Sequence, residues 1–480
     1  MPAQISNLPS ELLISILNLV DHSDLLRICL LSHHLHHCAL SIYFNRCNSS
    51  PSDDLSSIQE LRLHPYEDPF FRSPQALRAF RLSIFTTEIR HLKCRFEFPE
   101  HWLLWQLRWA YRAVEKAERV HEVTLDFSGL PLDLRAFGTP RMKPLDQWQH
   151  AFASFTKLAL SKRCQILRMI VAGGFMDGTE PVPPFHLSSL KEKVVRAVTH
   201  SFKRSASRTT ARSELHAFLA RLSVPLRSSN LSSLSFMALD KQSQDLKIPL
   251  STISVPALEE FAIWQESIQF SDLIPFLERH PGITSLRVKF LSRALRYVAD
   301  PPATLPDSFL PKLRYLALMS HHLPWFSALS LPDLRTIELD LHLNFARDFD
   351  DVVKNLGSVT DRICGKIRTL VLRVWPEDWA WLSSYQNHRD PVQTEPFPFD
   401  QVESLSIYSS DLAALHHIPH QNLSQWLAKF ISLRSLCITR SGPQPVSLDE
   451  QRTLAHAVFA QCSGLTSLSV NGVAVDRPND

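Results

Sequence analysis

Apolar residues follow a helical spacing in the first forty residues of this chain. From Leu12 onward they return every three or four residues, as on one face of a helix, and a second apolar run follows Asp24. Pro9 precedes the first run, where a helical turn tolerates a missing N–H. The pattern predicts three short helices between Ile5 and Ala39. Helices this short cannot bury a core of their own, so we expect the segment to need a partner.

A second pattern, of period two, begins at Ile58. Apolar residues stand at the first, fourth and sixth positions of a short phrase, which predicts a short strand. The phrase returns about every thirty residues, a spacing typical of repeat proteins. Several copies add a fifth apolar position, Val475 in the last one. The phrases begin at Ile58, Ile89, Val120, Leu231, Leu258, Ile283, Leu313, Leu334, Ile367, Val402, Leu433 and Leu465.

Helical patterns lie between several of these strands. Ser271 opens one that stops at Pro281, and Ser447 with Glu450 forms a capping box ahead of another. A strand and a helix repeated in this way predict a solenoid whose units bury their faces against neighbours. The phrase is irregular before residue 231 and more regular from 231 to 480. An α/β domain with short strands and no solenoid is the alternative.

A series of N-terminal residues forms a recognisable motif: Leu8-Pro9, Glu11-Leu12-Leu13, Ile16-Leu17, Leu19, Asp24-Leu25-Leu26-Arg27, Leu30-Leu31-Ser32 and Ala39. This motif resembles the F-box, by which substrate receptors of SCF ubiquitin ligases bind a Skp-type adaptor. Leu31 and Leu35 stand where the family commonly has Val and Trp. The strand phrases resemble degenerate leucine-rich repeats without their buried Asn. The two resemblances imply an α/β chain, with an N-terminal three-helix F-box followed by an irregular leucine-rich-repeat-like strand–helix solenoid.

We therefore expect adaptor-binding helices over 1–47, an irregular part over 48–230 and the repeat solenoid over 231–480. The resemblance implies a substrate-recognition subunit of an SCF-type (cullin–RING) ubiquitin ligase. It would bind a Skp-type adaptor, and through it a cullin, while the repeats hold an unknown target protein. A repeat scaffold that binds the adaptor outside any ubiquitin ligase is the alternative. The expected adaptor-binding residues are Leu8, Pro9, Leu12, Leu13, Ile16, Leu17, Leu25, Leu26, Leu30 and Leu31.

Composition narrows the classes of protein to which the chain could belong. The 480 residues are 44% hydrophobic and carry a net charge of +3, which fits a globular protein rather than a nucleic-acid binder. Eight scattered cysteines without a Cys-x-x-Cys pair fit buried thiols in a reducing compartment. No window is apolar enough for a membrane helix, so we expect a cytoplasmic or nuclear protein.

We expect neither an enzyme nor a cofactor, because no nucleophile, metal-ligand or nucleotide-binding motif occurs at a diagnostic spacing. His33 and His37 share a helix face, but a short His tract is only a compositional hint of metal binding. An unrecognised hydrolase between Val120 and Leu231 is a third alternative.

Two further segments are candidates for binding. The basic stretch 191–213 could be a patch for an acidic partner, although a solvated surface loop explains it more simply. Trp375, Trp379 and Trp381 follow one predicted strand and could bind the target protein. They could equally cover the apolar edge of their own repeat.

Overall fold

The structure is a computed structural model. It describes residues 8–47, 49–51, 56–63, 75–83, 86–97, 103–129, 145–171, 226–238, 250–265, 270–289, 309–323, 326, 331–341, 367–374, 399–409, 420–440 and 448–477. Within these residues the chain forms two compact units, with the change from one to the other near Leu258. Both units are mixed α/β structures built around parallel strands.

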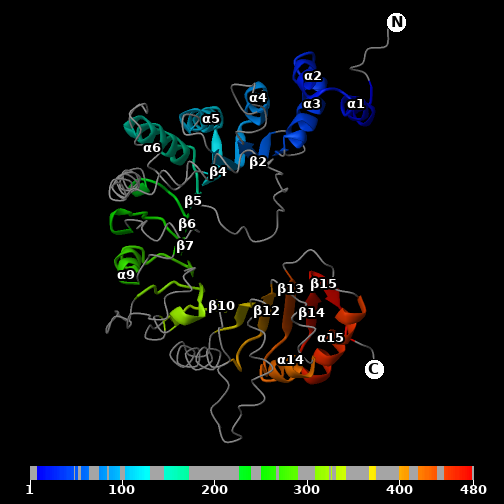
Figure 1. The fold of residues 1–480 in the computed structure, drawn as a ribbon, viewed down its shortest axis with the longest axis vertical. Coiled ribbons are helices and arrows are strands. Elements are labelled where there is room, and N and C mark those ends of the chain that lie inside the picture. Colours follow the sequence, from blue (N-terminus) through cyan, green and yellow to red (C-terminus); the bar gives the residue numbers. More distant parts are fainter. Residues whose placement is uncertain are drawn as a thin grey trace, which may run out of the picture. The chain divides into compact units, whose positions relative to one another are not determined.

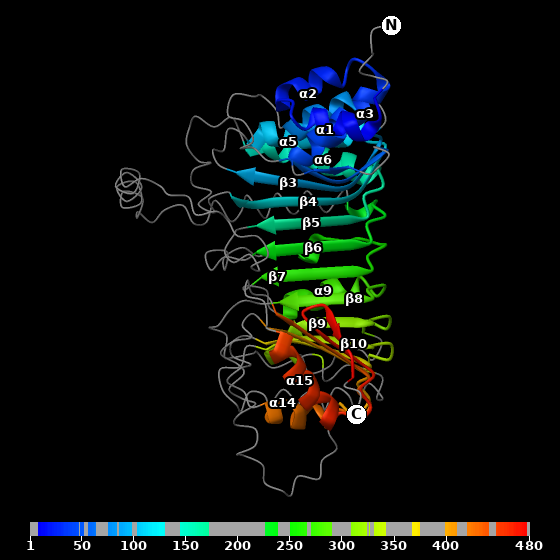
Figure 2. The same cartoon turned by 90° about the vertical axis from the view of Figure 1, so that its right-hand side faces the viewer.

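The first unit begins with three helices and continues as a sheet. The helices are α1 (Ser10–Leu17), α2 (His22–Ile28) and α3 (His33–Arg46). Strand β1 (Ser50–Pro51) pairs with β2 in the antiparallel direction, and β2 to β6 are parallel neighbours in chain order (Figure 2). Their bounds are β2 (Ser57–Leu63), β3 (Glu88–Glu97), β4 (Arg119–Gly129), β5 (Ile166–Val171) and β6 (Ser233–Ala238).

Helices cover one face of this sheet. They are α4 (Gln75–Leu82), α5 (Leu103–Lys116) and α6 (Leu145–Ser161), and a 3-10 turn, η5 (Leu250–Thr252), follows later in the chain. Helix α4 packs on β2, α5 packs on β2 and β3, and α6 packs on α5 (Figure 1). Helix α3 contacts α4 and β1, so the N-terminal helices join the covered side of the unit.

The second unit contains the remaining strands, and β7 to β14 are parallel neighbours in chain order. The last strand, β15, pairs with β14 in the antiparallel direction through a turn at Asn471 and Gly472, both at positive φ. The strands are β7 (Glu260–Gln265), β8 (Ser285–Lys289), β9 (Tyr315–Met319), β10 (Thr336–Leu341), β11 (Thr369–Val374), β12 (Ser404–Ser409), β13 (Ser435–Arg440), β14 (Ser467–Val470) and β15 (Val473–Val475). The helices are α9 (Phe270–Glu278), η6 (Ser320–His322), α14 (His420–Leu427) and α15 (Leu448–Gln461).

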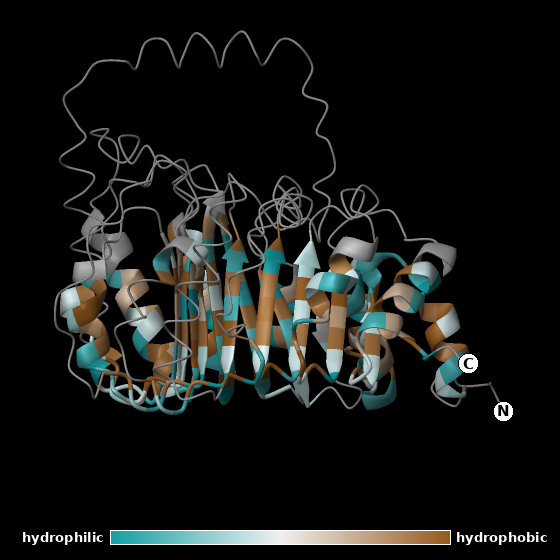
Figure 3. Ribbon diagram, turned by 90° about the horizontal axis from the view of Figure 1, so that it is seen from below, coloured by the Kyte–Doolittle hydropathy of each residue, from teal (hydrophilic) through white to brown (hydrophobic). Residues whose placement is uncertain are grey.

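The core of each unit lies on one face of its sheet. Strand residues alternate between faces, and Figure 3 shows both brown and teal segments along the strands. The predicted phrases lie in or directly before these strands, and their apolar residues form rows across them. One such row, buried throughout, is Leu286, Leu316, Ile337, Leu370, Leu405, Leu436 and Leu468.

Consecutive strands begin at the same level of the sheet. The N–H of Arg335 donates to the carbonyl of Arg314, and the N–H of Arg368 donates to the carbonyl of Arg335. The same bond continues from Glu403 to Arg368 and from Arg434 to Glu403. This repeated bond explains why the phrases are in register although the segments between them differ in length. The predicted domain boundaries at 47 and 230 stay predictions.

Candidate functional site

The N-terminal helices carry apolar side chains of two kinds. Leu13, Leu17 and Leu25 are 0, 3 and 0% exposed, and they pack between the helices. Leu12 and Ile16, from the same helix α1, are 53 and 48% exposed. Residues four apart share a helix face, so α1 turns Leu13 and Leu17 inward and Leu12 and Ile16 outward. Helix α1 therefore has more apolar surface than the core of this segment buries.

Local signals start and end these helices. The N–H groups of Leu12 and Leu13 both donate to the Pro9 carbonyl at 3.1 Å, and Glu11 lies in the positively polarised first turn of α1. Ser32 caps α3, because its hydroxyl oxygen accepts a hydrogen bond from the N–H of Leu35 at 3.2 Å.

Arg46, at the end of α3, links that helix to the end of α1. Its guanidinium donates to the carbonyls of Asn18 and Val20, each at 2.7 Å. Carbonyls at a helix C-terminus have no partner within the helix, and a cation there is favourable. Arg46 thus fixes the position of α1, which would otherwise be a two-turn helix attached by few buried side chains.

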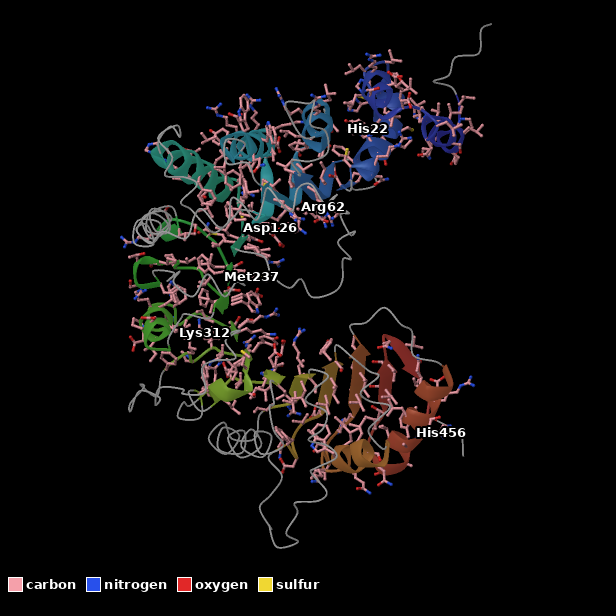
Figure 4. All side chains as sticks on the ribbon, viewed as in Figure 1. His22, Arg62, Asp126, Met237, Lys312 and His456 are labelled. Carbon is pink, nitrogen blue, oxygen red and sulfur yellow. The ribbon has the colours of Figure 1, made fainter. Side chains whose placement is uncertain are left out.

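Helix α3 supplies most of the core of this segment. Tyr43 and Phe44 are buried, and Tyr43 stacks on His22 with ring centroids 3.8 Å apart (His22 is labelled in Figure 4). His36 is also buried, and its Nδ1 lies 2.9 Å from the carbonyl oxygen of Cys29, at the end of α2. These contacts hold α2 against α3 without help from the outward side chains.

The outward apolar side chains are concentrated in this segment. Among the described residues, nine large hydrophobic side chains are exposed, and six of them belong to residues 12–31. Leu19 is 88% exposed, Leu31 is 72% and Leu30 is 66%. The full set of six is Leu12, Ile14, Ile16, Leu19, Leu30 and Leu31, which we call the apolar face. Exposed apolar side chains concentrated in one short segment make that segment a candidate interaction site.

The ten predicted adaptor-binding residues therefore fall into three groups. Pro9, Leu12, Ile16, Leu30 and Leu31 are exposed, Leu8 and Leu26 are half-buried, and Leu13, Leu17 and Leu25 are buried in the segment itself. The sequence-based choice of residues did not include Ile14 and Leu19. Leu19 belongs to the matching positions of the motif, which was the signal available for it, whereas nothing in the spacing distinguished Ile14.

The comparison with known families decides what this segment is similar to. Residues 5–47 match the F-box domain. The F-box segment thus coincides with α1, α2 and α3, and it supports an adaptor-type role in a ubiquitin ligase, through binding of a Skp-type adaptor. F-box proteins are typically adaptors rather than enzymes. The match covers the start of the chain and assigns nothing beyond residue 47.

Other comparisons add little. No curated protein matches the chain. One solved structure, of a protein from Bacteroides fragilis, is 12% identical over 74% of this chain and 74% of its own, with a TM-score of 0.33. At that score the likeness assigns neither fold nor function.

Two candidate segments from the sequence lie outside the described residues. They are the basic stretch 191–213 and the tryptophans Trp375, Trp379 and Trp381. In the parts of the chain that the structure describes, no three His, Cys, Asp or Glu side chains are grouped so that they could hold a metal ion. Within the same parts, no helix is long and apolar enough to cross a membrane.

Proposed function

We propose that this chain is a substrate-recognition subunit of an SCF-type ubiquitin ligase. The F-box segment would bind a Skp-type adaptor, and the adaptor would connect the chain to a cullin. The observation that carries the proposal is the apolar face, which lies within the segment that matches the F-box. Each of its side chains contributes about 1.5–3 kcal/mol when fully buried, before the cost of association is subtracted.

The strands of the two units would hold the target protein. Parallel strands in chain order, with in-register backbone bonds at their starts, support a leucine-rich-repeat-like solenoid. Such an array offers an extended surface, and in an SCF complex the ubiquitin-charged enzyme is supplied by other subunits. This chain would therefore contribute proximity rather than catalytic groups. We expect it to act in the cytoplasm or nucleus.

The test is binding of the full chain to a purified Skp-type adaptor. Leu30→Ala and Leu31→Ala together should weaken binding at least about tenfold, because they remove two exposed side chains of the apolar face. The matched control is Ile431→Ala, which removes a 75% exposed apolar side chain of the second unit and should leave binding unchanged. No adaptor binding by the wild-type chain, or equal binding by the Leu30/Leu31 variant, would contradict the proposal.

Recruitment of a cullin separates the ligase from the scaffold alternative. The chain–adaptor complex should bind a cullin N-terminal domain in gel filtration. A stable chain–adaptor complex that never takes up the cullin would instead favour a repeat scaffold outside any ubiquitin ligase.

A further inference from the structure

A charged cluster lies on the face of the second sheet opposite its core. Tyr315 and Glu338 alternate in their strands with the buried residues Leu316 and Ile337, so they point to the other face. Five neighbouring strands, β8 to β12, contribute to this charged cluster. Its members are Arg287, Lys289, Tyr315, Glu338, Arg373 and Tyr408, and Asp340 lies beside them.

Glu338 is the centre of the charged cluster. Its Oε1 accepts from the Nζ of Lys289 at 3.1 Å and from the Nε of Arg373 at 2.6 Å, and its Oε2 accepts from the Tyr315 hydroxyl. The side chain of Glu338 is only 8% exposed. Burial alone would raise the pKa of this carboxyl, but Lys289, Tyr315 and Arg373 lower it to about 2. Glu338 is therefore a fixed anion under the surface of the charged cluster.

The two arginines are held in defined positions. The Nε of Arg373 donates to Glu338, and the Arg373 guanidinium lies 5.1 Å from the ring centroid of Tyr408. Arg287 lies 5.0 Å from the ring centroid of Tyr315, whose hydroxyl is fixed by Glu338. A guanidinium is planar and pairs with a carboxylate through parallel N–H bonds, so ordered arginines on this face suit an acidic ligand.

The charges are not balanced at the surface. Arg287, Lys289 and Arg373 face two acids, Glu338 and Asp340, whose side chains are 8 and 13% exposed. The Arg373 side chain is 39% exposed, and Arg287 is exposed. Solvent therefore meets positive charge and two tyrosine rings, with the negative charge underneath.

Stability alone does not account for charged side chains here, because well-packed apolar residues in place of the whole set would usually stabilise a sheet face at least as well. Arginine and tyrosine are, in contrast, the residues that dominate binding energy at protein interfaces. We propose that the charged cluster binds an acidic, extended segment of the target protein, with carboxylates on Arg287 and Arg373. This inference rests on the proposed function and names the chemistry of the target.

The register of the strands sets the spacing of the acidic residues. Arg287, Ala317, Glu338 and Val371 form one row, and Arg373 lies two residues further along β11. Three strand spacings, about 14 Å, and the shift of two residues, about 7 Å, put the two positions roughly 16 Å apart. Residues four apart in an extended chain point to the same side and are about 14 Å apart, and the arginine side chains can span the remainder. The segment should therefore carry two acidic residues about four apart, with uncharged residues between them above Glu338.

Binding of defined peptides to the full chain tests the inference. The probes are fluorescent twelve-residue peptides with two glutamates four apart, the same peptides with glutamines, and a single-stranded oligonucleotide of equal length. The glutamate peptide should bind at least about tenfold more tightly than the glutamine peptide. Arg287→Gln and Arg373→Gln should each weaken its binding about fivefold or more. Arg368→Gln is the matched control, since Arg368 is 65% exposed in the same unit and pairs with Glu403 outside the charged cluster.

Each alternative result overturns the inference. These results are equal binding of the two peptides, an unchanged affinity of Arg287→Gln, an equal loss in Arg368→Gln, or tighter binding of the oligonucleotide. Thermal unfolding of every variant shows whether it is folded. Arg287→Gln leaves the hydrogen bonds of Glu338 in place, so it still tests the inference if Arg373→Gln does not fold. Adaptor binding by the same samples distinguishes failure of this inference from failure of the proposed function.

Discussion

At the scale of single residues, the partners of Glu338 are far from it along the chain. Its partners Lys289 and Arg373 are 49 and 35 residues away, and only the parallel register brings them together. The alternation of apolar positions predicts that Ile337 and Leu339 are buried and leaves Glu338 on the opposite face, as the structure shows. The alternation does not predict that Glu338 is buried as well, because that burial depends on side chains from three other strands.

Glu338 should make the stability of the second unit depend on acid. Its pKa in the folded chain is about 2, below the ordinary value of 4.5, so the unfolded chain binds more protons between these values. The stabilisation is present above pH 4.5 and is lost as the pH falls toward 2. Urea unfolding at pH 7, 4 and 3 measures this, and Glu338→Gln should cost roughly 2–3 kcal/mol at pH 7 and depend less on pH.

Glu403→Gln is the control for this measurement. Glu403 is 37% exposed and pairs with the exposed Arg368, so its removal should cost less than about 1 kcal/mol. An equal loss of stability in both variants would mean that Glu338 holds no special place in the sheet.

At the scale of elements, the apolar pattern predicts helix α1 but not which side of it faces the core. The spacing of Leu12, Leu13, Ile16 and Leu17 predicts a helix, and α1 confirms it. Spacing cannot tell which pair faces inward, because both pairs lie on adjacent strips of one apolar surface. The answer depends on Arg46 and α3, which fix the rotation of α1 from about thirty residues away along the chain.

Arg46→Met should loosen α1 while leaving its sequence intact. The change removes the cation that donates to the carbonyls of Asn18 and Val20, at a cost of about 1–2 kcal/mol. Hydrogen exchange of the α1 amides measures the loss as faster exchange. Arg27→Met is the control, because the Arg27 side chain is 83% exposed and only pairs with Asp24 on the surface. Equal exchange in both variants would contradict the role of Arg46.

At the scale of the whole molecule, the first strand, β1, and the last strand, β15, run antiparallel to their neighbours. The twelve phrases predict strands, and strands β2 to β4 and β6 to β14 lie at them. They do not predict that β1 and β15 are antiparallel, because such short strands carry too few residues for a pattern. Asn471-Gly472 is a hairpin signal, however, and it places Val475 in a returning strand rather than at the end of the last phrase.

Truncation after Val470 should make the chain self-associate. The deletion leaves the backbone groups of β14 that pair with β15 without a partner, and an open strand edge recruits another chain. Light scattering after gel filtration should show dimers or larger species at micromolar concentration. Val473→Thr, which changes a 51% exposed side chain and keeps the hairpin, should stay unassociated. A truncated chain with the same mass distribution as the full chain would show that β15 does not protect the edge.

The apolar face also has a consequence for the amount of this protein in a cell. Leucines such as Leu19 and Leu31 remain in contact with water for as long as the chain is alone. Chaperones and quality-control proteases bind exposed apolar surfaces, so a copy without an adaptor is open to degradation. Binding of an adaptor would cover this surface and protect the copy by mass action. The supply of the adaptor, more than the rate of synthesis, would then set how many copies persist.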